Sequence, residues 1–79
     1  MTWLPDIQWR ILAALRNLGG FQSIRTIAAR LDEPLYRVRA EFSALFRQQL
    51  VCRDHQYHYA LTARGEALSW EHQQQELPL

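Results

Sequence analysis

The stretch "IRTIAARLDEPLYRV", residues 24 to 38, interrupts one helical pattern and begins another within three residues. Ser23, just before it, is a good residue to cap the amino end of a helix. Pro34 cannot continue a helix that precedes it, because it lacks a backbone N–H, but its fixed φ suits the start of a new helix. We therefore predict a helix over about 23–31 and another over about 34–48, joined by a turn at Asp32-Glu33-Pro34. The apolar residues that define the first of these helices are Ile24, Ile27, Ala28 and Leu31.

Helical periodicity also extends toward the amino terminus. A helix is predicted over about 4–18, and Gly19-Gly20 end it because glycine adopts the left-handed cap conformation without steric cost. One apolar stripe of each helix is expected to be buried in a common core. The stripe of the first helix is Leu4, Ile7, Ile11, Ala14, Leu15 and Leu18, and that of the third is Leu35, Val38, Phe42, Leu45 and Phe46.

The segment "LVCRDHQYHYALT", residues 50 to 62, changes from helical to β-strand character. Its two β-prone runs, 50–53 and 57–61, are separated by Asp54-His55-Gln56, which predicts a small hairpin over 50–61. Thr62 is then placed to cap a fourth helix over about 63–74, and the end 75–79 is expected to be frayed.

The predicted order is helix, helix, helix, hairpin, helix, in a single domain over residues 1–79 that is mainly α with a small β-hairpin (α+β). Two short helices joined by a tight turn are typical of the helix-turn-helix motif, and a hairpin directly after the second of them is a wing. The sequence therefore predicts a winged helix-turn-helix fold with 34–48 as its recognition helix.

Two motifs resemble known regulators of this fold. The segment "YRVRAEFSALFRQQLV", residues 36–51, resembles the recognition helix of winged helix-turn-helix regulators. "YALTARGEAL", residues 59–68, is similar to the Tyr-x-Leu-Thr-x-x-Gly element that closes the wing in MarR-like and PadR-like regulators. The resemblance implies a transcription regulator that binds double-stranded DNA. Such proteins commonly have Gly where this chain has Gln49, so we expect a cost of about 1 kcal/mol there or a shifted helix end.

The basic residues of the chain are unevenly distributed. All nine are Arg, and with five acidic residues they give residues 1–65 a charge of +4. Residues 66–79 carry three Glu and no basic residue, a charge of −3, so the net charge is only +1. Arg can form bidentate contacts with phosphate or guanine, which favours nucleic acid as a partner. The alternative is a compositional bias of the source organism.

The exposed face of the third helix, opposite Val38 and Phe42, is the candidate for contact with the major groove. Small residues there allow close approach to base edges, and Arg side chains can reach guanine or phosphate. The second helix and the wing are expected to contact the DNA backbone. The alternative is a solvated surface, with Arg37 paired to Glu41 and Ser23 acting only as a cap. The candidates are Tyr36, Arg37, Arg39, Ala40, Ser43 and Arg47 on the third helix, Ser23 and Arg25 at the second, and Arg53 on the wing.

A homodimer is expected, because reading a palindromic DNA site requires two-fold symmetry. Trp9, Ala67 and Trp70 are the candidates for its interface. Equally, Trp70 could fold back onto the first helix and bury Trp9 or Trp3 within one chain. The near-neutral charge and the acid at the wing tip support a different class, a winged-helix module that binds a protein partner as a subunit or an inhibitor.

Other chemistry is not indicated. Cys52, His55 and His58 form C-x-x-H-x-x-H, but they fall on two strands and a hairpin tip with no evident fourth ligand, so neither a metal nor another cofactor is expected. The serines stand in no activating motif and there is no Gly-rich phosphate loop, so an enzyme is not expected. With neither a long apolar run nor a secretory signal, the expected location is the cytoplasm.

Overall fold

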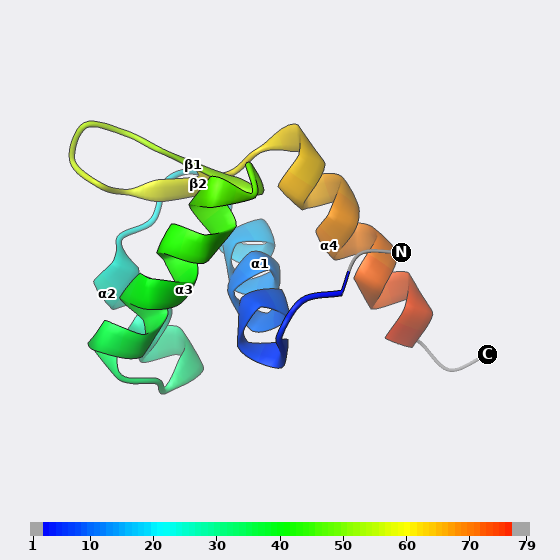
Figure 1. Ribbon diagram of the computed structural model, residues 1–79, viewed down its shortest axis with the longest axis horizontal. Coiled ribbons are helices and arrows are strands. Elements are labelled where there is room, and N and C mark those ends of the chain that lie inside the picture. Colours follow the sequence, from blue (N-terminus) through cyan, green and yellow to red (C-terminus); the bar gives the residue numbers. More distant parts are fainter. Residues whose placement is uncertain (1–2, 77–79) are drawn as a thin grey trace.

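The computed structural model describes residues 3–76, within which lie four helices and a two-stranded hairpin (Figure 1). In chain order the elements are α1 (Asp6–Leu18), α2 (Ile24–Leu31), α3 (Leu35–Arg47), β1 (Val51–Arg53), β2 (Tyr59–Leu61) and α4 (Ala63–Glu76). This order confirms the predicted winged helix-turn-helix fold, mainly α with a small hairpin. The wing projects at one end of the molecule and α4 lies toward the other end, packed on α1.

Two helix ends differ from the sequence-based expectation by two residues, whereas the ends of α2 and α3 lie within one residue of it. Helix α1 begins at Asp6 rather than at residue 4, because the backbone of Pro5 is extended and its carbonyl accepts the first helical hydrogen bond, from Gln8 N at 2.9 Å. Helix α4 continues to Glu76 rather than ending near 74. The remainder of the predicted frayed end, residues 77–79, lies outside the described residues.

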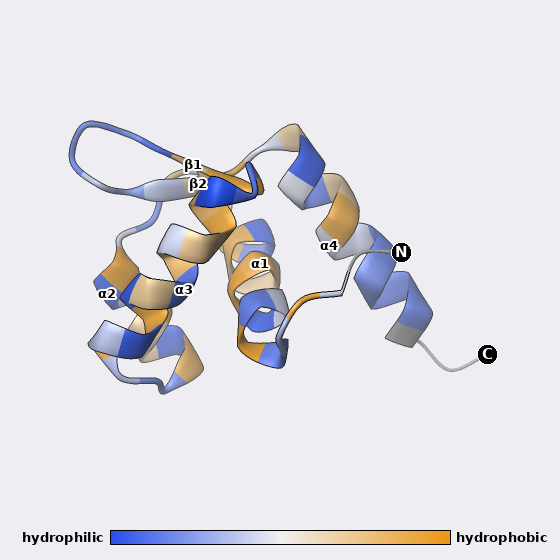
Figure 2. Ribbon diagram, in the orientation of Figure 1, coloured by the Kyte–Doolittle hydropathy of each residue, from blue (hydrophilic) through white to orange (hydrophobic). Residues whose placement is uncertain are grey.

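The core lies between α1, α2, α3 and the hairpin, and the hydrophobic residues of these elements face one another there (Figure 2). Phe42 of α3 is fully buried and stacks on Tyr59 of β2, with 4.5 Å between the ring centroids. Two predicted core residues are exposed instead, Leu18 and Phe46, each at 37%. Leu18 is the last residue of α1, and the ring of Phe46 lies under the Arg53 guanidinium of the wing. Leu12, outside the predicted stripe, is fully buried.

The turn between α2 and α3 forms as the sequence predicts. Asp32 takes the left-handed conformation at the end of α2, with φ of 55°, and its N–H donates to the carbonyls of the last turn. Pro34 then stands at the amino cap of α3 with an extended backbone. The two helices of the motif are thereby joined over three residues.

The wing is an antiparallel hairpin in which Val51 pairs with Leu61 and Arg53 with Tyr59. Its second strand begins at Tyr59 rather than at 57, because Tyr57 lies in the turn with φ of 61°. Gln22, in the α1–α2 connection, exchanges two backbone hydrogen bonds of 2.8 Å with Tyr59. This bridge attaches the start of the helix-turn-helix motif to the wing, and sequence periodicity did not indicate it.

The junction of α3 with the wing keeps a left-handed residue without glycine. Gln49 has φ of 61°, and the N–H groups of Gln49 and Leu50 donate back to the last turn of α3 at 3.0 and 3.1 Å. Of the two outcomes expected for Gln49, the structure shows the strained cap, which costs about 1 kcal/mol. Thr62 supports it, since its hydroxyl donates to the Gln49 carbonyl at 2.7 Å. The same hydroxyl accepts from Gly65 N at 3.0 Å, so Thr62 caps α4 as predicted.

Candidate nucleic-acid interface

Helix α3 has one buried and one exposed face. Val38, Phe42 and Leu45 are fully buried, and the opposite side of the helix is open to solvent. The structure brings all six candidates of this helix to the exposed side: Tyr36, Arg37, Arg39, Ala40, Ser43 and Arg47. Tyr36 is the most exposed large hydrophobic residue of α3, at 75%, and the Ser43 hydroxyl donates to the Arg39 carbonyl one turn earlier, at 3.3 Å. The face therefore combines small residues at its centre with Arg side chains around them.

The arginines of the chain fall into two groups. Within residues 3–76, four have side-chain partners: Arg10, Arg16, Arg37 and Arg53. The other five form no ion pair or side-chain hydrogen bond in this part of the chain: Arg25 and Arg30 on α2, Arg39 and Arg47 on α3, and Arg64 on α4. Four of the five unpaired guanidinium groups therefore lie on the two helices of the helix-turn-helix motif. The basic residues that are unevenly distributed in the sequence thus give α2 and α3 a local excess of unpaired arginines.

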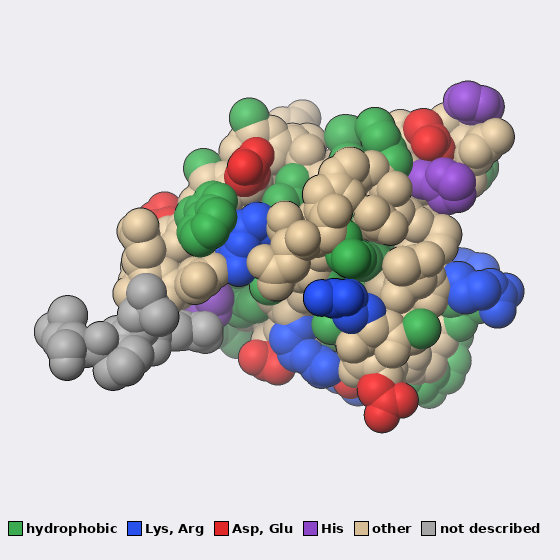
Figure 3. All heavy atoms as spheres, turned by 180° about the vertical axis from the view of Figure 1, so that it is seen from behind, with side chains coloured by type: hydrophobic (Ala, Val, Ile, Leu, Met, Phe, Trp, Pro, Cys, Tyr) green, Lys and Arg blue, Asp and Glu red, His purple; other side chains and the backbone are tan. Residues whose placement is uncertain are grey.

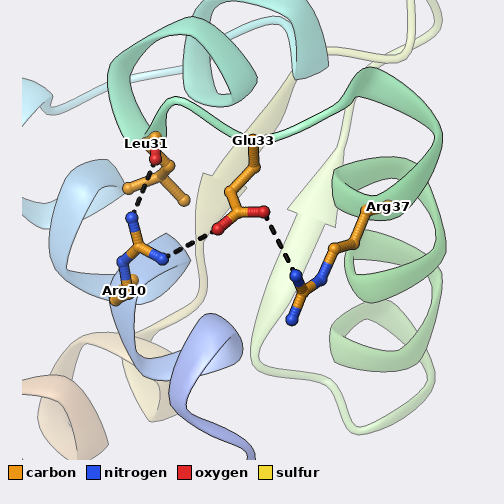
Figure 4. Close-up of polar contacts among 4 residues, drawn as sticks. All are labelled: Arg10, Leu31, Glu33 and Arg37. Carbon is orange, nitrogen blue, oxygen red and sulfur yellow. Dashed lines mark hydrogen bonds and ion pairs between the residues drawn. The ribbon is translucent and has the colours of Figure 1, made fainter.

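Arg37 is held by an acid, but not by the one expected. Its guanidinium pairs with Glu33, in the turn before α3, at 3.3 Å rather than with Glu41 (Figure 4). Glu33 also pairs with Arg10 of α1 at 3.1 Å, and Arg10 donates to the Leu31 carbonyl at 2.8 Å. Glu41 is engaged elsewhere, because its carboxylate accepts from the Gln8 side chain at 3.0 Å. Arg37 remains about half exposed, so its contact with Glu33 is a weak surface pair.

The amino end of α2 carries the next two candidates. The Ser23 hydroxyl accepts from Thr26 N at 3.0 Å and donates to the Thr26 hydroxyl at 2.9 Å, so it is used as a helix cap. Arg25 is exposed in the first turn. The amino end of this helix presents N–H groups and a partial positive charge, which suits an anion such as phosphate.

The wing tip is acidic by composition, but its carboxylate is used internally. Asp54 Oδ1 accepts from the N–H groups of Gln56 and His58, each at 2.9 Å, and these bonds shape the turn. The His58 N–H in particular holds the pKa of Asp54 below its ordinary value of 3.8. The His58 ring lies 3.6 Å from the other carboxylate oxygen. Arg53, the wing candidate, lies with its guanidinium carbon 4.3 Å from the Phe46 ring centroid and 4.9 Å from that of Tyr57.

Helices α1 and α4 pack side by side and enclose a groove of about 410 Å³. Trp9 stacks on His72 at 3.8 Å, and Arg16 donates to the Ser69 hydroxyl at 2.6 Å. Trp70 is 47% exposed with the Arg16 guanidinium over its ring, and Ala67 is exposed beside it. The fourth helix does fold onto the first, but it is His72 rather than Trp70 that covers Trp9. Trp3 is 82% exposed.

Other functional features are sparse. Cys52, His55 and His58 do not converge, and within residues 3–76 no three His, Cys, Asp or Glu side chains are grouped to hold a metal ion. Every helix in that range is too short or too polar to cross a bilayer.

On the side turned away from the viewer of Figure 1, basic and acidic side chains are interspersed and no broad basic field appears (Figure 3).

Solved structures of transcription regulators have the same fold. A transcriptional regulator protein from Pseudomonas aeruginosa PA01 matches 86% of this chain with a TM-score of 0.81 and 22% sequence identity. Ligand-free NadR matches 91% of this chain with a TM-score of 0.80 and 26% sequence identity. A mutant of ZitR from Lactococcus lactis matches 92% of this chain with a TM-score of 0.77 and 22% sequence identity. The chain spans about half of each of these proteins: 49%, 54% and 53%. No family model and no curated protein matches the chain.

Proposed function

We propose that this winged helix-turn-helix domain, whose fold is shared with transcription regulators, binds double-stranded DNA sequence-specifically by inserting α3 into the major groove. In this proposal Arg39 and Arg47 contact guanine or phosphate. The small side chain of Ala40 lets α3 come close to the base edges, and Tyr36 and Ser43 form hydrogen bonds to DNA phosphates. The amino end of α2, with Ser23 and Arg25, is placed on the adjacent phosphates.

The observation that carries the proposal is the exposed face of α3. Arg39 and Arg47 are exposed and unpaired within residues 3–76, whereas Arg37 is shared with Glu33. An arginine without an internal partner breaks no protein ion pair when it meets a phosphate, so its new contact is not offset by the loss of an existing one. Before Arg37 can bind a DNA phosphate, it must break its ion pair with Glu33 or divide its N–H groups between Glu33 and the phosphate. Among the arginines of α3, Arg39 and Arg47 are therefore the ones whose loss is expected to weaken binding most.

The proposal includes a homodimer formed through the outer side of α4. Ala67 and Trp70 are exposed on α4, and Trp9 lines the groove between α4 and α1. Burying Trp70 against a second copy would remove a large apolar surface from water. Trp70→Ala is expected to convert the dimer to a monomer in sedimentation or light scattering, whereas an unchanged mass would remove Trp70 from the interface.

Selection of duplexes from a random pool tests the DNA proposal. Enrichment of a palindrome, with a complex mass of two chains per duplex, is the expected result, and affinity should fall steeply as salt concentration rises. The second candidate function is a protein-binding module, favoured by the exposed Phe21 and Trp70. No enriched duplex, together with a nearly salt-independent interaction with a purified protein, would favour that candidate instead.

A further inference from the structure

The Arg53 guanidinium on the wing lies over two aromatic rings. It lies over the rings of Phe46 and Tyr57, at 4.3 and 4.9 Å from their centroids. Aromatic rings attract a guanidinium through its flat face, whereas its N–H groups lie in the plane. Within residues 3–76, those N–H groups have no hydrogen-bond acceptor and no acidic partner. The contact therefore fixes the side chain without using the donors that recognise phosphate.

The two rings come from different elements that meet beside the proposed DNA face. Phe46 is seven residues, or about two turns, after Arg39 on α3, so the two side chains lie on one flank of the exposed face. Arg53 is therefore held at the carboxyl end of the same flank. A phosphate that follows the groove edge past Arg39 would meet Arg53 next.

The turn of the wing is built to present Tyr57. The Asp54 carbonyl accepts from Tyr57 N at 3.1 Å, and the Asp54 carboxylate accepts from the residues on either side of Tyr57. These bonds keep Tyr57 at φ of 61°, a conformation that is unfavourable for an aromatic residue. The acid at the wing tip thus shapes the loop that brings a ring to Arg53.

We propose that Phe46 and Tyr57 are positioning residues that hold Arg53 for a bidentate contact with one DNA phosphate at the carboxyl end of α3. The proposal rests on the DNA-binding function proposed above. A long side chain that is ordered before binding loses less entropy when it meets its partner. Loss of either ring is therefore expected to weaken binding even though the charge of Arg53 remains.

The test is a double-mutant cycle on a selected duplex, measured by fluorescence anisotropy at several salt concentrations. Arg53→Ala is expected to weaken binding about tenfold or more and to lower the salt slope by about 1. Phe46→Leu and Tyr57→Leu should each weaken it roughly 2- to 10-fold with the salt slope retained. In the Arg53→Ala background the two Leu substitutions should have no further effect.

Matched variants separate positioning from folding and from net charge. Phe46→Tyr and Tyr57→Phe keep the rings and should bind like the wild type. Arg64→Ala removes the same charge from α4 and should leave the salt slope nearly unchanged. In the free protein, the Arg53 Nε–H proton should show a ring-current shift that each Leu substitution reduces, and thermal unfolding checks that each variant is folded.

Two results would overturn the proposal, and they are distinguishable. If the wild type binds but the Leu substitutions weaken binding equally with Arg53 absent, the rings have a structural role and only the positioning proposal fails. If the wild type binds no duplex at all, the proposed function fails and this role fails with it.

Discussion

Gly65→Ala is the substitution whose effect the structure defines most sharply. A Cβ at this position would overlap the Leu50 carbonyl oxygen and lie 2.9 Å from the carbonyl carbon and 3.3 Å from the Cα. All three atoms belong to the backbone of a residue that is only 1% exposed, so no flexible side chain can move aside. Either α4 must move away or the start of the wing must shift.

Two opposing effects determine how much Gly65→Ala changes the free energy of unfolding. Alanine gains about 1 kcal/mol over glycine in a helix. Overpacking against a fixed backbone costs about 1–3 kcal/mol or more, and a shift of α4 also disturbs the 3.2 Å bond from Thr62 N to the Leu50 carbonyl. Because the overlap is with backbone, we expect the upper end of this range and a net loss of about 2 kcal/mol in the free energy of unfolding. For a domain of this size that lowers the Tm by about 10 °C.

Urea unfolding followed by tryptophan fluorescence measures the loss. Glu71→Ala and Glu71→Gly, at an exposed site of the same helix, are the control for helix propensity, and the Gly variant should be less stable than the Ala variant by about 1 kcal/mol. Alanine should thus be the better residue of the two at 71 and the worse one at 65. A Gly65→Ala protein as stable as the wild type, or more stable, would refute the close approach of α4 to Leu50.

Two further predictions concern backbone strain and pH. Gln49→Gly should raise the free energy of unfolding by up to about 1 kcal/mol, because residue 49 has a left-handed φ of 61°, which glycine adopts without the steric penalty of a Cβ. A destabilised variant in the same urea assay would count against a strained cap. The pKa of Asp54 is lowered by the His58 N–H, so its stabilisation is present above the ordinary value of 3.8 and is lost as the pH falls through the lowered pKa. The Tm difference between the wild type and Asp54→Asn should therefore be constant near neutral pH and shrink in acid, and a difference that is independent of pH would contradict this.

The sequence predicts the fold because local signals agree with it. Pro34 and the Gly19-Gly20 pair mark helix boundaries, Thr62 caps α4, and the buried stripes of α1 and α3 follow helical periodicity. Periodicity fails where a contact comes from a distant element. Phe46 has the spacing of a core residue, but Arg53 from the wing covers it at the surface.

The candidate surface is less predictable for the same reason. Helical spacing places the arginines of α3 on the exposed side, but it cannot show which of them have partners. Glu41 is one turn from Arg37 in the sequence, yet Glu33 binds Arg37 and Arg10 together, a contact set by the packing of α1 against the turn. The Asp54 side chain, an acid by composition, is taken up by backbone N–H groups of its own turn. Such pairings depend on three-dimensional proximity, which no local pattern contains.

The most direct test of the central claim is the affinity of the Arg39→Ala/Arg47→Ala protein for the duplex that the wild type selects, with Arg64→Ala as a control for charge. Both arginines are exposed on α3, so the double variant should fold like the wild type. We predict that it loses roughly a hundredfold or more in affinity, as expected for two contacts to bases or phosphates, while Arg64→Ala binds nearly normally. A folded double variant with wild-type affinity would contradict the insertion of α3 into the major groove.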